Sequence, residues 1–260
     1  MELGRIVELW LPHVVGVALC GARFLPVAFL CPLFGGVSAP TTVRLALVLT
    51  LAMAVHLAGG VGAPHVDGAW SFAGAAVREL LFGISLGLIA SLPFDAARMG
   101  GRFIDLFRGS SAEATLPAAG TQESATGDGL YQLLVALAVS SAAFPAVLGG
   151  LFKSFQVVPL GAFVAHESVA MTGVRTATAA LTTGLAVGAP IAGAAMAVDC
   201  VLGFASRIAP QMNLQEVGAP LRILGGGAVV WLSLGVLCER LLGEVLGLEH
   251  MLHSLSEAAR

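Results

Sequence analysis

Charge is the first thing that this sequence lacks. Only 11% of its 260 residues are charged, whereas soluble domains carry about 25%, and 57% are hydrophobic. Lys153 is the sole lysine, and no stretch clusters basic residues as a phosphate-binding patch does. With a net charge of -3, this excludes a nucleic-acid partner, and the composition indicates a membrane protein.

Cysteine pairs and metal-ligand spacings are also missing. The four cysteines are isolated, without any C-x-x-C spacing, and we interpret them as small apolar packing residues: Cys20, Cys31, Cys200 and Cys238. His250 and His253 beside Glu249 lack a third ligand in register, so a solvated helix face is expected there. We expect no metal and no cofactor.

Two apparent enzyme motifs lack the context that their chemistry needs. Gly83 to Gly87 matches G-x-S-x-G, but it lies in an apolar helical run without the strand-to-helix turn that presents a nucleophilic serine. Gly149 to Ser154 resembles a phosphate-binding loop, yet Phe152 stands where that loop requires glycine. The sequence therefore predicts a protein without enzymatic activity.

Apolar segments long enough to cross a membrane fill most of the chain. A retained first helix is predicted at the N-terminus, because Glu2 and Glu8 make a poor signal-peptide start. Four further apolar runs have the length of about 20 residues that a membrane-crossing helix needs: Phe24 to Val43, Leu45 to Val66, Gly129 to Phe152 and Thr176 to Val198. Two shorter apolar runs bring the candidates to six: Leu80 to Phe94 and Ile223 to Cys238.

Proline and glycine interrupt these runs. Each internal proline removes a backbone hydrogen bond that protein or water must replace in lipid, so the broken helices need neighbours: Pro26, Pro32, Pro40, Pro145 and Pro190. G-x-x-x-G spacings, which let two helix backbones approach closely, occur at Gly83/Gly87, Gly184/Gly188 and Gly243/Gly247. The fold class expected is all-α, with membrane-associated helical hairpins.

A charged island divides the apolar halves. Asp95, Arg98, Arg102 and Asp105 share one helical face as neighbours of opposite sign, so the helix that holds Leu80 to Phe94 is expected to continue to about Gly109. We predict one membrane-embedded domain over 1–260, with an N-terminal half (1–94), a central segment (95–128), a C-terminal half (129–238) and a tail (239–260).

The tail is amphipathic. Its apolar stripe is Leu241, Val245, Leu248, Leu252 and Leu255, and four glutamates lie mostly off that stripe. Because acids outnumber arginines there, anionic lipid is a poor ligand, and the alternatives are packing on a protein partner or a solvated helix end.

Asp199 and Arg207 follow an apolar run, two helical turns apart. Ionisable groups at membrane depth cost about 2.5 to 3.5 kcal/mol each, so they usually face protein or water and are often functional. The alternative is a pair at the membrane boundary that ends the helix.

Three blocks in order resemble the FliR/SctT family of bacterial type III secretion. They are "GRFIDLFRGSSAEATLPAAGTQES", "FPAVLGGLFKSFQVVPLG" and "GAPIAGAAMAVDCVLGFASRIAPQMN". The I-D-x-x-R-G and G-x-Q-x-S patterns resemble the injectisome branch of the family more than the flagellar branch. The sequence departs from the family at Leu116, where an acidic residue or Asn commonly precedes the proline that is Pro117 here.

This resemblance implies a helical subunit of an export gate in the bacterial inner membrane. Its implied partners are SctR-like, SctS-like, SctU-like and SctV-like export-apparatus subunits, the unfolded substrate proteins in transit and membrane lipid. The subunits of this family are helical hairpins wound around a pore, which implies a nonenzymatic role as part of a channel.

Two sets of site residues follow as hypotheses. The central loop is expected to project towards the pore and help to close it, with candidates Ile104, Asp105, Phe107, Arg108, Gly109, Ser110, Ser111, Pro117, Gly120 and Gln122. Subunit packing is expected to involve Gly149, Gly150, Ser154, Pro159, Pro190, Asp199, Gly203, Arg207, Pro210 and Gln211.

Two competing functions remain open from the sequence. A small-solute secondary transporter has similar broken helices and intramembrane charges, and would require related Gly/Pro interruptions in both halves. An intramembrane hydrolase would rest on Ser85 and needs a histidine partner, for which His56 is the candidate.

Overall fold

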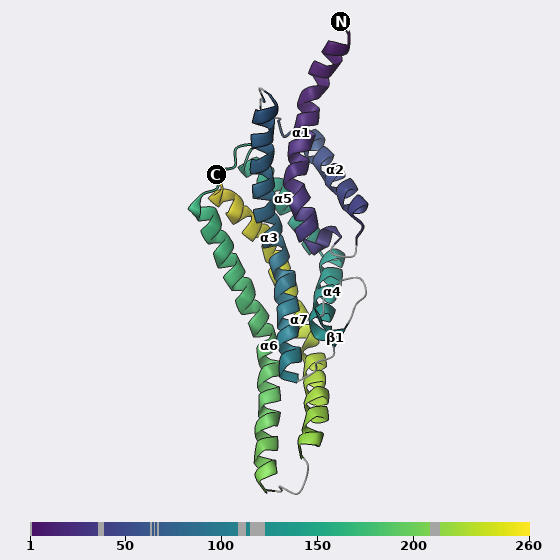
Figure 1. Cartoon of the computed structure of the whole chain (residues 1–260), viewed down its shortest axis with the longest axis vertical. Helices are drawn as coiled ribbons and strands as arrows, with labels where there is room; N and C mark the ends of the chain where they lie inside the picture. The colour runs from purple at the N-terminus through teal and green to yellow at the C-terminus, as the bar shows by residue number, and fades with distance from the viewer. Residues whose placement is uncertain are drawn as a thin grey trace. The chain divides into compact units, whose positions relative to one another are not determined.

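The described part of the chain is a set of seven α-helices (Figure 1). This computed structural model describes residues 2–35, 39–62, 64, 66, 68–108, 113–114, 123–208 and 214–260. The helices are α1 (Glu2–Leu30), α2 (Thr41–Ala58), α3 (Ala69–Arg108), α4 (Ala125–Ser140), α5 (Ala143–Val157), α6 (Glu167–Ile208) and α7 (Leu214–Ala258). The all-α prediction is confirmed, with one short addition, the antiparallel pair of β1 (Glu113–Ala114) and β2 (Glu123–Ser124).

Two compact units share these helices. Unit 1 comprises residues 1–92, 138–177 and 245–260, and unit 2 comprises residues 93–137 and 178–244. Phe82, Leu86 and Leu151 are among the fully buried side chains of unit 1, and Phe94, Ile104 and Ile191 among those of unit 2. Each unit therefore has its own apolar core.

Three helices are long and apolar enough to cross a membrane, among the residues that could be searched. They are Trp10–Leu30, Ala69–Arg108 and Glu167–Ile208, and the bent pair of α4 and α5 would make a fourth if it is one broken span. This is fewer than the six runs and first helix predicted above. Some runs are parts of longer helices, and α2 is a shorter apolar helix over Thr41–Leu57.

Prolines explain two differences from the predicted runs. The run Phe24 to Val43 is not one helix: α1 ends at Leu30, Pro32 opens a short 3-10 helix (Pro32–Phe34), and Pro40 is the N-cap of α2. In Gly129 to Phe152, α4 and α5 meet at 77°. The break lies near Ser141, four residues before Pro145. A continuous helix would need a hydrogen bond from the Pro145 nitrogen to the Ser141 carbonyl, and proline has no N–H to donate.

Two of the three predicted glycine spacings bring helices together. A side chain at Gly83 would overlap the Arg23 carbonyl oxygen, and one at Gly87 would lie 3.0 Å from Val27 Cα, so α3 packs closely on α1. Gly184 and Gly188 pack in the same way on the Ala96 and Gly100 carbonyls of α3. The third spacing is different, because a Cβ at Gly243 or Gly247 would meet nothing within 4 Å.

The tail stripe lies inside the chain. Leu241, Val245, Leu248, Leu252 and Leu255 are each at most 1% exposed. A Cβ on Gly150 of α5 would lie 3.2 Å from Leu252 Cδ1, so α5 covers part of the stripe. Both alternatives for the tail, a partner surface and a solvated end, are therefore wrong for the stripe, because this chain's own helices bury it.

The cysteines divide by position. Cys20 and Cys31 are buried, as a packing role predicts, whereas Cys200 is exposed and Cys238 half-buried. The packing interpretation is therefore wrong for Cys200 within a single chain.

The close approach of α1 and α3 can be tested at one glycine. Gly83→Ala should destabilise the protein by about 1–3 kcal/mol, because the new methyl group meets backbone that cannot move aside. Gly243→Ala is the matched control and should leave stability unchanged or raise it by up to about 1 kcal/mol. Thermal unfolding in detergent micelles measures both, and equal midpoints for the two variants would contradict the packing.

Candidate functional site

A buried ion pair holds unit 1 together. Arg23 of α1 donates from Nε to Glu79 Oε2 of α3 at 2.6 Å, and from Nη2 to Glu79 Oε1 at 3.1 Å. The two side chains are 1% and 0% exposed. A bidentate pair of this kind offsets the large cost of burying both charges only when the remaining polar atoms also find partners.

Those remaining polar atoms are satisfied by backbone. Arg23 also donates to the carbonyl oxygens of Ser154 at 3.1 Å and Val158 at 3.0 Å, at the end of α5. Glu79 Oε1 accepts the Gly161 N–H at 2.7 Å. The guanidinium carbon lies 4.8 Å from the Phe82 ring centre and 4.2 Å from that of Phe155. One arginine therefore joins α1, α3, α5 and the loop after α5.

A second polar cluster lies in unit 2, at both ends of the central segment. Asp105, near the end of α3, accepts the Thr126 N–H at 2.9 Å and the Thr126 hydroxyl at 2.6 Å, at the start of α4. Arg108 lies 3.7 Å from Asp105 and donates to the Ile223 carbonyl of α7 at 3.1 Å. The side chains at the end of α3 therefore bind α4 and α7.

The start of α4 is capped in the way that its sequence favours. Ser124 Oγ accepts the Gly127 N–H at 3.0 Å, which satisfies a free donor of the first helical turn. Gly127 itself touches Gly101 of α3, where a Cβ would overlap backbone. The S-A-T-G-D sequence carries this cap signal, a serine directly before the first helical residue.

The charge ladder on α3 is shared with α4. Arg98 lies 3.4 Å from Asp128 and its guanidinium carbon 4.0 Å from the Tyr131 ring centre. Asp105 is buried and Asp95 is exposed, so the charged residues of the ladder differ in their exposure to solvent. The prediction that this helix continues to about Gly109 is confirmed, since α3 ends at Arg108.

The structure places four of the ten central-loop candidates. Ile104 and Asp105 are buried, and Phe107 and Arg108 are half-buried, with Phe103 and Phe107 edge-to-face at 4.7 Å. These four belong to the base of the segment. The other six lie outside the described residues: Gly109, Ser110, Ser111, Pro117, Gly120 and Gln122.

The subunit-packing candidates fall into two groups, apart from Pro210 and Gln211, which lie outside the described residues. Gly150 and Ser154 are buried inside the chain, and Gly149 is half-buried with open space beside its Cα. The others are exposed: Pro159, Pro190, Asp199, Gly203 and Arg207. Asp199 and Arg207 thus lie on exposed parts of α6.

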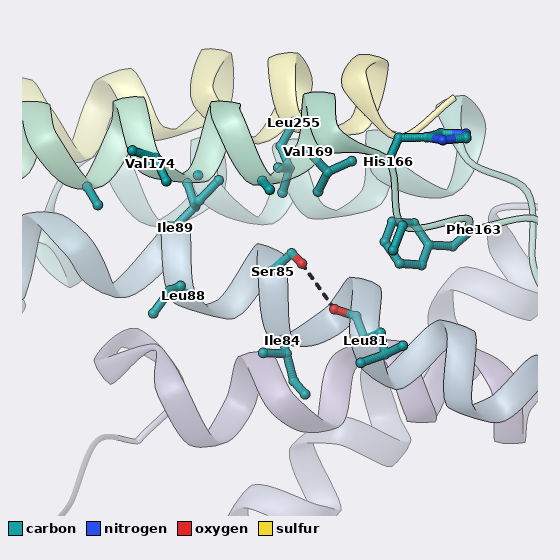
Figure 2. A pocket seen from close by; sticks show the side chains of 14 residues that line it. Leu81, Ile84, Ser85, Leu88, Ile89, Phe163, His166, Val169, Val174 and Leu255 are labelled. Carbon is teal, nitrogen blue, oxygen red and sulfur yellow. Dashed lines mark hydrogen bonds between the residues drawn. The ribbon is translucent and has the colours of Figure 1, made fainter.

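Neither apparent enzyme motif has an activated group. The Ser85 hydroxyl, in the middle of α3, donates to the Leu81 carbonyl of its own helix at 3.1 Å (Figure 2). His56 instead lies 3.0 Å from His13, and its Nδ1 lies 3.0 Å from the Val61 carbonyl. Ser85 and His56 therefore do not form the pair that nucleophilic catalysis needs.

Lys153, in the phosphate-loop resemblance, lies inside α5. Its ammonium is 2.5 Å from Glu249 Oε1, and this hydrogen bond, with the charge attraction, holds the pKa of the Glu249 carboxyl below its ordinary value of 4.5. The lysine that a phosphate would need is therefore paired with an acid of α7.

Comparison with known proteins identifies the chain. Residues 14–247 match the family described as bacterial export proteins, family 1. The chain belongs to this family. It is 30% identical to the flagellar biosynthetic protein FliR of Aquifex aeolicus over 82% of both chains, and 30% identical to FliR of Bacillus subtilis over 74% of this chain and 75% of that one.

The export family also includes a relative with a different name. The chain is 27% identical to the Yop proteins translocation protein T of Yersinia pestis, over 64% of this chain and 63% of that one. The predicted resemblance to the FliR/SctT family is therefore confirmed. The preference for the injectisome branch stays a prediction, because both kinds of relative are similar to this chain.

Arg23 and Glu79 are the residues that sequence reasoning missed in this export protein. Each stands within or beside an apolar run, and a lone ionisable residue in such a run usually has a buried partner. That signal was present, but it does not say which acid pairs with which base across 56 residues.

Removing one partner of the Arg23–Glu79 pair should destabilise the protein much more than removing both partners. Arg23→Met leaves the Glu79 carboxylate buried and unpaired, which should lower the free energy of unfolding by about 3–5 kcal/mol. The double variant Arg23→Met/Glu79→Leu should recover most of that loss. Thermal unfolding in detergent micelles measures both.

The exposed pair of Lys153 and Glu249 supplies the control. Lys153→Met should leave the unfolding midpoint almost unchanged, because water screens that pair. If Arg23→Met lowers the unfolding midpoint no more than Lys153→Met does, the buried pair does not hold unit 1 together.

Proposed function

We propose that this protein is a nonenzymatic subunit of a bacterial type III export apparatus, forming part of the channel for unfolded substrate proteins across the inner membrane. The observation that carries the proposal is family membership over residues 14–247. Relatives named as a flagellar biosynthetic protein and as a translocation protein support an export role. The long apolar helices support a place in the membrane.

The bonding of the polar residues supports a structural role rather than a catalytic one. Arg23 and Glu79 bind each other and backbone, Ser85 binds its own helix, and Lys153 binds Glu249. A nucleophile or general base needs a free lone pair or proton at a reacting atom. The energy for transport would then come from other components of the apparatus.

The central segment is proposed to help close the channel. Its two ends are tied by Asp105, Thr126 and Arg108, and β1 pairs with β2 with Glu113 opposite Ser124. Hydrogen bonds of this kind, with Asp105 buried, fix the end of α3 against the start of α4. Since Ile104 and Asp105 are buried at the base of the segment, the closing residues would be those that follow Arg108.

SctR-like, SctS-like, SctU-like and SctV-like subunits are the proposed partners. Part of α6 supports such contacts: Val201, Phe204 and Ile208 are 67%, 69% and 85% exposed, beside Asp199 and Arg207. Exposed apolar surface of this kind contacts lipid or another subunit. The family favours export over the alternative of a small-solute secondary transporter.

Ion conductance tests the closure proposal. In complexes reconstituted with the partner subunits, deletion of Gly109 to Pro117 should raise the leak several-fold. Thr126→Val removes the hydroxyl that donates to Asp105 at nearly constant shape, and should give a smaller increase.

Thr182→Val is the matched control for the conductance test, because the Thr182 hydroxyl donates to the Ala179 carbonyl of its own helix. It should leave the leak at the wild-type level. Unchanged leakage in the deletion variant, with normal assembly, would refute the closure role.

Copurification tests the role of α6 in assembly. Arg207→Ala should reduce the yield of SctR-like and SctS-like subunits bound to the tagged protein several-fold, because Arg207 is exposed beside the apolar side chains of Phe204 and Ile208 and would pair with a neighbouring subunit there. Arg175→Ala, also exposed on α6, should not. Normal assembly with lost secretion in Arg207→Ala would instead indicate a direct role in transport.

A further inference from the structure

An apolar groove of about 480 Å³ lies in unit 1 (Figure 2). One wall is α3, and the other is the first part of α6 with the loop before it, which contributes Phe163 and His166. Leu255 of α7 closes the floor. The volume lies within the range of about 300–1,000 Å³ that small-molecule sites occupy.

The interior of the groove offers hydrocarbon and almost no hydrogen bonds. Ile89, Val169 and Leu255 are 1%, 8% and 0% exposed, and they form a buried apolar floor. Ser85 is a polar side chain within the groove, and its hydroxyl already donates to the Leu81 carbonyl. A polar ligand would therefore lose its hydrogen bonds with water without replacing them.

The rim of the groove is apolar and open. Leu81, Leu88 and Val174 are 47%, 51% and 60% exposed. Both walls belong to helices that are candidates for crossing the membrane. In a bilayer, such an open groove faces lipid chains directly, so its natural occupant is hydrocarbon.

One end of the groove is basic. His166 lies at that end, beside Phe163 (Figure 2). Arg78 precedes Leu81 by three residues on the same face of α3, is exposed, and donates from Nη1 to the Gly161 carbonyl at 3.1 Å. A guanidinium has five N–H donors, so this bond leaves others for a phosphate.

Three acids of the described residues lie near this end, and none of them lines the groove. Glu257, two residues after Leu255, lies 3.8 Å from His253. Glu79 is buried and bound to Arg23 and to the Gly161 N–H. Glu167 is exposed in the first turn of α6, where the helix N-terminus stabilises a negative charge, and it does not line the groove. Arg78 is the basic side chain that is bound beside this end, through the Gly161 carbonyl two residues before Phe163.

We propose that this groove binds one acyl chain of an anionic phospholipid, with Arg78 contacting the phosphate. Basic residues next to apolar surface between membrane helices recognise lipid headgroups in this way. The proposal goes beyond the export function and does not depend on it, because it needs only a membrane and the residues of unit 1.

Photocrosslinking tests the site on the wild-type protein. A phosphatidylglycerol with a diazirine in its acyl chain should label peptides 81–89 and 169–177 in proteoliposomes. Unlabelled phosphatidylglycerol should reduce that labelling several-fold more than phosphatidylcholine at equal concentration. Equal competition by the two lipids would overturn the proposal, as would the absence of label from peptides 81–89 and 169–177 in wild-type protein.

Variants locate the acyl chain and the headgroup separately. A Cβ at Gly173 meets nothing within 4 Å, so Gly173→Trp should fill the groove and reduce labelling at least fivefold. Gly193→Trp, equally open on the same helix but outside the groove, is the control and should label as wild type.

For the headgroup, Arg78→Gln keeps a donor for the Gly161 carbonyl but loses the charge. It should abolish the preference for phosphatidylglycerol, whereas Arg240→Gln, exposed on α7, should keep it. Unfolding midpoints in detergent show whether each variant is folded. Wild-type labelling in folded Gly173→Trp, or an unchanged preference in folded Arg78→Gln, would overturn the proposal.

Discussion

The buried pair of Arg23 and Glu79 constrains the rest of unit 1. Two charges with almost no exposure are tolerable only if every donor and acceptor has a partner, and the partners come from α1, α3, α5 and the loop after α5. The pair also requires α1 and α3 to lie close together. Gly83 and Gly87 permit that approach, because they place no side chain between the two backbones.

Unit 2 uses a similar principle at the ends of the central segment. Asp105 receives two hydrogen bonds from Thr126, and Arg98 pairs with Asp128, so the polar residues of α3 are bound to α4. These bonds show the structural role of the few charged residues in this chain. The buried charges connect helices, while exposed apolar side chains remain for lipid or for other subunits of an export apparatus.

Much of the fold follows from local patterns in the sequence. The long apolar runs predict helices, the spacing of Gly83/Gly87 and Gly184/Gly188 predicts close packing, and the ladder from Asp95 predicts the extension of α3 to Arg108. The tail stripe was correctly predicted as one face of a helix. Its partner could not be predicted, because a stripe records what is buried but not what covers it.

The sequence by itself determined the membrane class, the helical fold and the family, since these rest on composition, periodicity and the order of motifs. Only the tertiary structure decided that Arg23 pairs with Glu79, that Ser85 binds its own helix, and that α5 covers the tail. The physical reason is range. Helix formation depends on neighbours within a few residues, whereas ion pairing and burial depend on which distant segments meet in space.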